Sequence, residues 1–120
     1  MLIKQSTKDQ YELLQLPEGL FNTAIADELS DKCRQCRASG RSVIIDASSI
    51  EAIEGDNLHA IAQWQMDAYE ANTSWVMAGL KTNLQFIPDD MEINYTPTLD
   101  EAIDIVAMEI IEREFLNDDF

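Results

Sequence analysis

The first half of the chain contains short apolar-rich segments that predict strands. Two of them, at residues 2–6 and 10–16, flank a polar turn, and the Pro-Glu-Gly triplet that follows ends the second. Residues 42–46 carry an unbroken apolar run, which is typical of a central strand that is buried on both faces. We expect residues 47–55 to form the loop that leaves this strand.

Between these strands the apolar spacing becomes helical and predicts a helix over residues 22–39. The apolar residues of its buried face recur at intervals of four, four and three positions: Ile25, Leu29, Cys33 and Cys36. Asn22 is a good N-cap residue, and Gly40 is well placed to end the helix.

The second half of the chain repeats this alternation. We predict a helix from residue 56 to about residue 72 and a buried strand at 74–79. A short helix at 81–86 and a short strand at 92–95 should follow. The order of elements then closes with one long helix, over residues 98–120.

The final helix has a clear start and an unusual end. Thr98 and Glu101 form a capping box, and the expected apolar stripe consists of Leu99, Ile103, Val106, Ile110 and Ile111. Residues 98–120 contain eight acidic residues and one basic residue, Arg113. The tail is nevertheless apolar at Ile110, Ile111, Phe115, Leu116 and Phe120, so it either packs back on the sheet or contacts a second copy or a partner.

This order predicts one α/β domain over residues 1–120. We expect an open mixed sheet of about five strands with parallel inner strands, about four helices and a long C-terminal helix. Functional loops of such sheets follow the carboxyl ends of the strands. Here these are the loops after Leu16, Asp46 and Gly79.

Charge limits the classes of partner. Eight basic residues stand against 23 acidic ones, which gives a net charge of −15. Nucleic acids and anionic membrane surfaces would repel such a chain. The sequence has no run of 18 apolar residues and no signal-peptide pattern, so we expect a cytoplasmic protein that does not insert into a membrane.

Few residues could support catalysis or a metal site. The single histidine, His59, reads as an exposed helix residue. Cys33 and Cys36 have CxxC spacing but lie late in a helix, where its dipole disfavours a thiolate, so we expect reduced core cysteines. The chain contains neither GxxxxGK[ST] nor GxGxxG. We therefore predict no enzyme activity, no cofactor and no metal.

Three carboxylates remain of interest around the loop at residues 47–55. Asp46 ends the buried strand, and we expect it to anchor the loop by hydrogen bonding. Glu54 and Asp56 flank Gly55 at the start of the next helix, where acidic groups complement the helix dipole. The same two groups could form a negatively charged recognition surface, and the two interpretations are compatible.

The segment Val43-Ile44-Ile45-Asp46-Ala47-Ser48-Ser49-Ile50-Glu51-Ala52-Ile53-Glu54-Gly55-Asp56-Asn57-Leu58 resembles the core of the STAS domain, which is shared by sulfate transporters and anti-sigma factor antagonists. That family has an apolar strand ending in Asp, a small polar loop, and an Asp-Ser-x-Gly-Leu turn that opens a helix. Weaker likenesses lie at residues 11–22, 75–80 and 96–102. The resemblance implies the fold predicted above.

The departure from the family pattern bears on regulation. In anti-sigma factor antagonists the serine of this turn is phosphorylated by the partner kinase. Here Glu54 stands at the Asp position, Gly55 at the Ser and Asn57 at the Gly. A glycine has no hydroxyl, so the resemblance implies a protein that is not phosphorylated at this position.

The resemblance further implies a non-catalytic module for signalling and transcription regulation. It would dock on a kinase-type anti-sigma factor or a related regulator through residues 48–57 and the helix that follows. The expected contact residues are Leu20, Phe21, Asn22, Ser48, Ser49, Glu54, Gly55, Asp56, Asn57 and Leu58. An alternative is an accessory subunit of an ABC-type lipid transport ATPase, and a weak homodimer also remains open.

Overall fold

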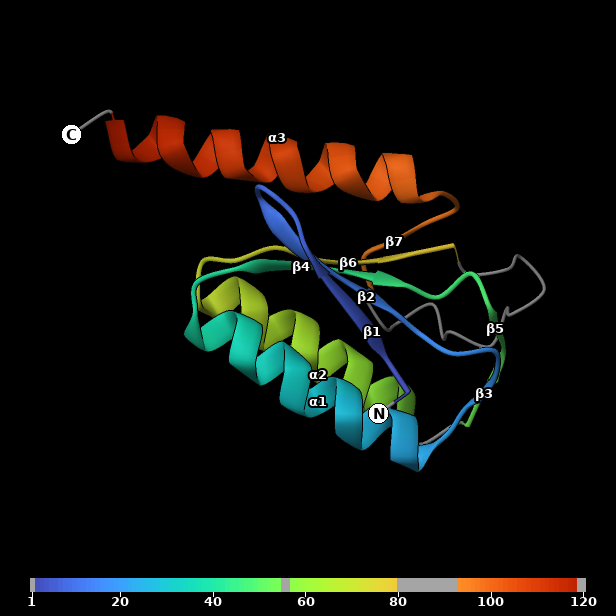
Figure 1. The fold of residues 1–120 in the computed structure, drawn as a ribbon. Coiled ribbons are helices and arrows are strands. Elements are labelled where there is room, and N and C mark those ends of the chain that lie inside the picture. The colour runs from blue at the N-terminus through green and yellow to red at the C-terminus, as the bar shows by residue number, and fades with distance from the viewer. Residues whose placement is uncertain (1, 55–56, 80–92, 119–120) are drawn as a thin grey trace.

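The chain forms a central sheet between two layers of helices (Figure 1). The structure is a computed structural model and describes residues 2–54, 57–79 and 93–118. The main sheet has five strands, in the order β1 (Lys4–Thr7), β2 (Tyr11–Gln15), β4 (Ser42–Asp46), β6 (Trp75–Ala78) and β7 (Tyr95–Thr96). β1 is antiparallel to β2, and all other neighbours are parallel. The predicted mixed sheet with parallel inner strands is thus confirmed.

Helices cover both faces of this sheet. α1 (Thr23–Ala38) and α2 (Asn57–Glu70) lie on one face, and α3 (Leu99–Asp118) lies on the other (Figure 1). The two layers enclose separate apolar clusters. In β4, Val43 and Ile45 belong to the α1/α2 cluster, while Ile44 packs with Ala102 and Val106 of α3. An unbroken apolar run in the sequence therefore marks a strand that is covered on both sides, as predicted.

The ends of two helices follow the predicted capping residues. Asn22 Oδ1 accepts a hydrogen bond from the Ile25 N–H at 3.0 Å, and Thr98 Oγ1 accepts one from the Glu101 N–H at 3.3 Å. Gly40, with φ +69°, closes α1, since the Arg41 N–H bonds back to the Cys36 carbonyl at 2.9 Å. Local sequence thus sets where α1 and α3 begin.

One buried carboxylate holds the β1–β2 hairpin. Glu12 accepts hydrogen bonds from Gln5 Nε2 and Thr7 Oγ1, both at 2.8 Å, and from Arg41 Nη2 at 3.1 Å. The same guanidinium donates to the main-chain carbonyls of Lys8, Asp9 and Tyr11. Arg41, just before β4, therefore fixes the turn between β1 and β2.

The observed strands differ from the predicted ones in two places. A second, two-stranded parallel sheet is formed by β3 (Gly19–Phe21) and β5 (Ile50–Ile53). The sequence predicted the end of a strand at the first of these segments and a loop at the second. Both strands are too short for a period of two to stand out. The last strand, expected at residues 92–95, is observed at Tyr95–Thr96, while position 92 lies outside the described residues.

The helices also differ in number and in burial. The described residues contain three helices instead of about four, and the predicted short helix at 81–86 lies outside them. Leu99, Ile103, Val106 and Ile110 pack on the sheet as predicted. Ile111, assigned to the same stripe, is exposed, as are Phe115 and Leu116. Of the two alternatives for the tail, packing back on the sheet is therefore excluded for these three side chains. No helix in the described part of the chain is long and apolar enough to span a membrane.

Candidate functional site

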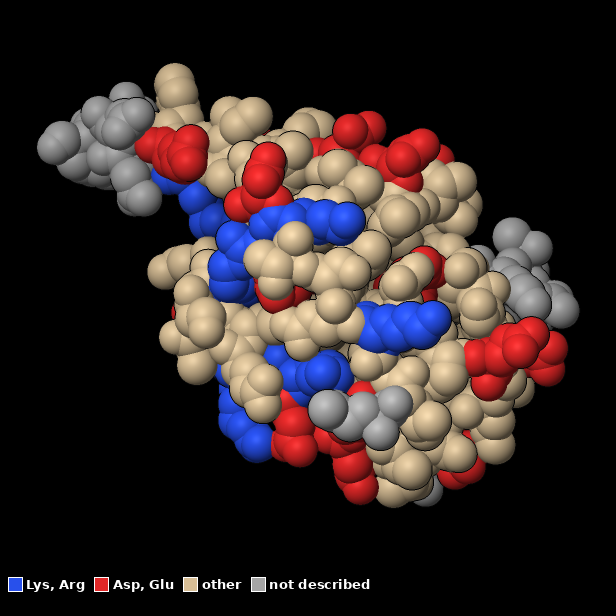
Figure 2. Space-filling model, in the orientation of Figure 1, with Lys and Arg blue, Asp and Glu red and all other residues tan. Residues whose placement is uncertain are grey.

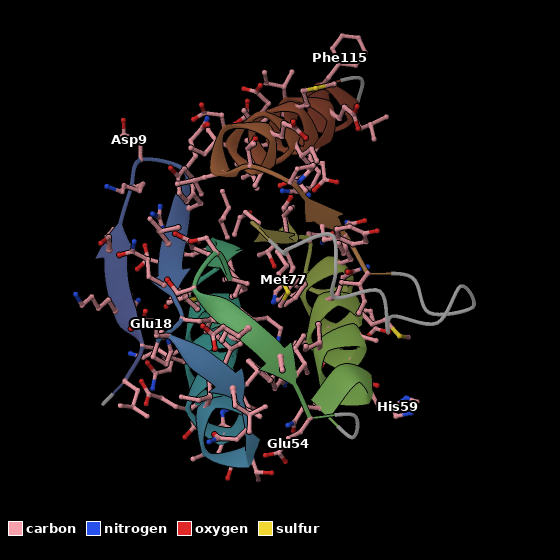
Figure 3. All side chains as sticks on the ribbon, turned by 90° about the vertical axis from the view of Figure 1, so that its right-hand side faces the viewer. Asp9, Glu18, Glu54, His59, Met77 and Phe115 are labelled. Carbon is pink, nitrogen blue, oxygen red and sulfur yellow. The ribbon has the colours of Figure 1, made fainter. Side chains whose placement is uncertain are left out.

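The carboxyl ends of β2, β4 and β6 lie at one edge of the sheet, as the parallel order requires. Main-chain hydrogen bonds continue past the strands there. The Leu16 N–H donates to the Asp46 carbonyl at 3.0 Å, and the Ala47 N–H donates to the Ala78 carbonyl at 2.8 Å. Figure 3 looks onto this edge and shows β3 and β5 side by side in front of it. The described residues that directly follow these strands are therefore tied together by main-chain hydrogen bonds.

Two contacts fix the turn at Ser48 and Ser49. The Ser48 N–H donates to Asp46 Oδ1 at 3.0 Å, which is the loop contact expected for Asp46. From the other side Gly79 approaches so closely that a Cβ placed on it would lie 2.9 Å from Ser48 Cβ. Ser48 and Ser49 are both exposed. The turn therefore presents two hydroxyl-bearing residues on a fixed backbone.

The β3·β5 pair continues from this turn. The Gly19 N–H donates to the Ser49 carbonyl at 3.1 Å, and the Glu54 N–H donates to the Phe21 carbonyl at 3.1 Å. The Phe21 carbonyl also lies 3.5 Å from Asn57 Nδ2, at the start of α2. These bonds link the loop, β3 and α2 into one surface, which we call the loop edge and define as residues 18–22 and 48–54.

The structure divides the predicted contact residues into surface and interior. Leu20, Ser48, Ser49 and Glu54 are exposed, and Leu20 is 47% exposed. Phe21 is 1% exposed and Asn57 is 8% exposed, so their side chains lie in the interior and are not part of the exposed surface. Phe21 packs in the core, and Asn57 supports β3.

Four predicted contact residues remain. Asn22 is half-buried because its side chain caps α1. Gly55 and Asp56, including the predicted cap at Asp56, lie outside the described residues, as does the side chain of Leu58. Sequence reasoning missed Gly79, although a glycine directly after a buried strand is a signal for a close backbone approach.

The loop edge is acidic. Glu18, Glu51 and Glu54 are exposed, and Figure 3 shows Glu18 and Glu54 at the margins of the β3·β5 pair. Residues 18–22 and 48–54 contain no Lys or Arg. In Figure 2 the corresponding right-hand edge carries acidic side chains, while Lys and Arg lie at the centre and on the left of the view. Sequence reasoning also missed Glu51, which lies in β5, and Glu18, which directly precedes β3, because neither short strand was predicted.

The residues considered for catalysis do not assemble into a site. His59 is exposed on α2, as predicted. Cys33 and Cys36 are free and buried; burial raises the pKa of Cys33 to about 12 and also raises that of Cys36. The raised pKa of each thiol disfavours the thiolate, which is the nucleophilic form of cysteine. The described residues contain no group of three His, Cys, Asp or Glu that could hold a metal ion.

Comparison with known proteins identifies the fold. No protein-family model matches the sequence, and no curated protein matches it. Among solved structures, a protein of Thermotoga maritima assigned as an anti-sigma factor antagonist has a TM-score of 0.71 at 13% identity, over 88% of this chain and 94% of that one. The anti-sigma factor antagonist SpoIIAA in its unphosphorylated form gives 0.68 at 10% identity, over 88% and 97%.

A third similar structure, an anti-sigma factor antagonist from Mycobacterium paratuberculosis, has a TM-score of 0.66 at 18% identity, over 88% of this chain and 92% of that one. The chain therefore has the STAS fold of anti-sigma factor antagonists. This agrees with the resemblance that the sequence showed between Val43 and Leu58.

Proposed function

We propose that this protein is a non-catalytic regulatory module of the cytoplasm that binds a protein partner through the loop edge, residue 55 and the start of α2. The observation that carries the proposal is the turn at Ser48 and Ser49, held by Asp46 and by Gly79. A surface whose backbone is already fixed loses little conformational entropy on binding. It is therefore suited to recognise another protein without rearrangement.

The side chains of the loop edge favour a basic partner. Leu20 provides an exposed apolar contact, and the loop edge also exposes the acidic side chains of Glu18, Glu51 and Glu54. An apolar centre with a polar rim is the usual make-up of a protein interface. Complementary charge on the partner would accelerate association and select against acidic surfaces.

The similar structures suggest the class of partner. Because they include anti-sigma factor antagonists, we infer that the partner is a kinase-type anti-sigma factor or a related regulator. Position 55 is a glycine and has no hydroxyl to phosphorylate. Phosphorylation of a serine adds about −1.5 to −2 charge at neutral pH. A glycine at position 55 would not allow this change of charge there. The module would then bind without phosphorylation control at this position.

A pull-down from native lysate with two leucine variants tests the proposal. Leu20→Arg changes the loop edge, and Leu2→Arg makes the same change at a side chain outside the loop edge that has a similar exposure, 57% against 47%. Wild type and Leu2→Arg should retain one partner that Leu20→Arg loses, with mass spectrometry identifying an ATPase-fold anti-sigma factor. Equal recovery by all three proteins would contradict the assignment of the surface.

The same experiment separates the alternative function. If Leu20→Arg releases a transport ATPase, the loop edge docks, but the protein is a transporter subunit. Phosphorylation is tested separately by incubating the chain with the captured kinase and Mg·ATP and measuring its intact mass. We expect no added phosphate on residues 48–57, and a phosphate there would contradict the unswitched module.

A further inference from the structure

α3 is apolar on two sides. Its inner face packs on the sheet through Leu99, Ala102, Ile103, Val106 and Ile110. On the opposite side, Met108, Ile111 and Phe115 follow one another at spacings of three and four residues and are 60%, 61% and 67% exposed. Figure 3 shows Phe115 pointing away from the rest of the molecule. We call these three side chains the outer stripe.

The described part of the chain provides no cover for the outer stripe. The second half of α3 extends beyond the edge of the sheet (Figure 1). Beneath it lies a cleft of about 470 Å³, bordered by Ile110, Arg113 and Leu116 of the helix and by Arg41. Surface helices normally present a polar face to water, and a helix that is apolar on both sides is usually covered on both. Contiguous exposed apolar side chains mark interaction surfaces.

Charge indicates what can cover the stripe. Asp104 lies one turn before Met108 on the same side, and Glu112 and Glu114 lie on the two flanks of Phe115. If the outer stripes of two copies paired, these acidic flanks would face each other, as like charges at the flanking positions of a coiled coil do. Each copy also carries a net charge of −15. A second copy is therefore a poor occupant, and a segment flanked by Lys or Arg is a good one.

We propose that the outer stripe is a second docking surface, which binds an apolar helical segment of a partner protein with Lys or Arg on both flanks. The geometry is that of helix-to-helix recognition through anchors at i, i+3 and i+7. This inference is independent of the function proposed for the loop edge, because it rests on different residues at the opposite end of the sheet (Figure 1).

Two synthetic peptides can test this surface on the full chain. Both carry the same leucine seam on a helix and a fluorescent label, but one has Lys and the other Glu at the flanking positions. Fluorescence anisotropy should show binding of the Lys peptide and at least about tenfold weaker binding of the Glu peptide. Binding of the Lys peptide should weaken as salt is added.

Matched variants assign the binding to the outer stripe. Met108→Gln, Ile111→Gln and Phe115→Gln keep a good helix former, and the Phe115 change should weaken binding about tenfold, as truncation of a central anchor does. Met66→Gln on α2, at 55% exposure, is the control for Met108→Gln and should bind normally. Leu20→Arg should also bind normally, which separates this surface from the loop edge.

Three outcomes would overturn the proposal. They are absence of binding by the Lys peptide, equal binding of the two peptides, and unchanged binding by all three stripe variants. Sedimentation equilibrium on the peptide-free chain tests whether a second copy of the chain occupies the outer stripe instead. If wild type forms a dimer that Phe115→Gln dissociates, the stripe belongs to an interface between two copies, and the proposal is wrong.

Discussion

Gly79 lies directly against the backbone of Ser48. A Cβ on Gly79 would stand 2.9 Å from Ser48 Cβ and 3.1 Å from both Ser48 Cα and Ser48 N. Gly79 also has φ +80°, a conformation that other residues rarely adopt. Two independent constraints thus require glycine at the end of β6, and both act on the loop edge.

Gly79→Ala should destabilise the protein strongly. The left-handed conformation costs about 1–2 kcal/mol for a residue with a Cβ, and the contact with Ser48 adds an overpacking cost of about 1–3 kcal/mol. Urea unfolding monitored by circular dichroism measures the loss. Gly40→Ala is the matched control, since Gly40 has φ +69° but nothing within 4 Å of the added Cβ. Equal losses for the two variants would show that the contact with Ser48 contributes nothing.

Asp46→Ala should loosen the turn at Ser48. The Ser48 N–H loses its acceptor at 3.0 Å, which we expect to cost about 0.5–1.5 kcal/mol in the free energy of unfolding. Amide hydrogen exchange at Ser48 should become faster, while exchange in α3 should not change. Asp46→Asn retains a side-chain oxygen and should lose less protection. Faster exchange in Asp46→Asn than in Asp46→Ala would argue against this role.

Glu12 should make stability depend on pH in the acid range. Burial raises the pKa of this carboxyl, but hydrogen bonds from Gln5, Thr7 and Arg41 outweigh it, so its pKa is lower than usual. Its contribution is therefore present above the unfolded-state pKa of about 4.3 and is lost as the pH falls through the lower folded-state value. Because a buried charged partner is removed, Glu12→Gln should cost about 1–3 kcal/mol at pH 7 and less at pH 3.

Chemical denaturation of wild type and Glu12→Gln from pH 7 to pH 3 measures this difference. Glu70→Gln, an exposed position at the end of α2, controls for the loss of one negative charge. A cost of Glu12→Gln that stays constant over this range would contradict the assigned role of the ionised carboxylate.

Cys33 and Cys36 should not react in the folded protein. Burial raises the pKa of both thiols, to about 12 for Cys33, so the thiolate is scarce at pH 8 and the sulfurs are shielded. A thiol-specific disulfide reagent should label neither residue in buffer and both in concentrated urea. Rapid labelling of the native chain would contradict this prediction and would favour a redox role for the CxxC pair.

Local signals in the sequence predicted the main sheet and its helices. The run from Val43 to Ile45 indicated a central strand, and Asn22 and Thr98 located the starts of α1 and α3. These features depend on neighbouring residues, so they can be read from a short stretch of chain.

The β3·β5 pair could not be predicted in this way. Its partners, such as Phe21 and Ile53, are far apart in the sequence, and each strand is at most four residues long. The burial of Phe21 and Asn57 could not be predicted either, because it depends on how β3 packs against the core and the start of α2, which are far apart in the sequence. The exposure of Ile111 was missed because apolar residues on both sides of α3 leave its buried face undefined.

The parallel topology also determines how much chain lies between the strands that pair. Among the described strand pairs of the main sheet, β1·β2 is the one that closes through a short turn, whereas β2·β4 and β4·β6 each enclose a whole helix. Closing such long loops lowers the chain entropy before any stabilising contact between the strands has formed. β3 follows β2 along the chain and β5 follows β4, so the β3·β5 pair continues the pairing of β2 with β4. Under the proposed function, a partner of the loop edge would therefore depend on the register of the main sheet as well as on the residues of the surface itself.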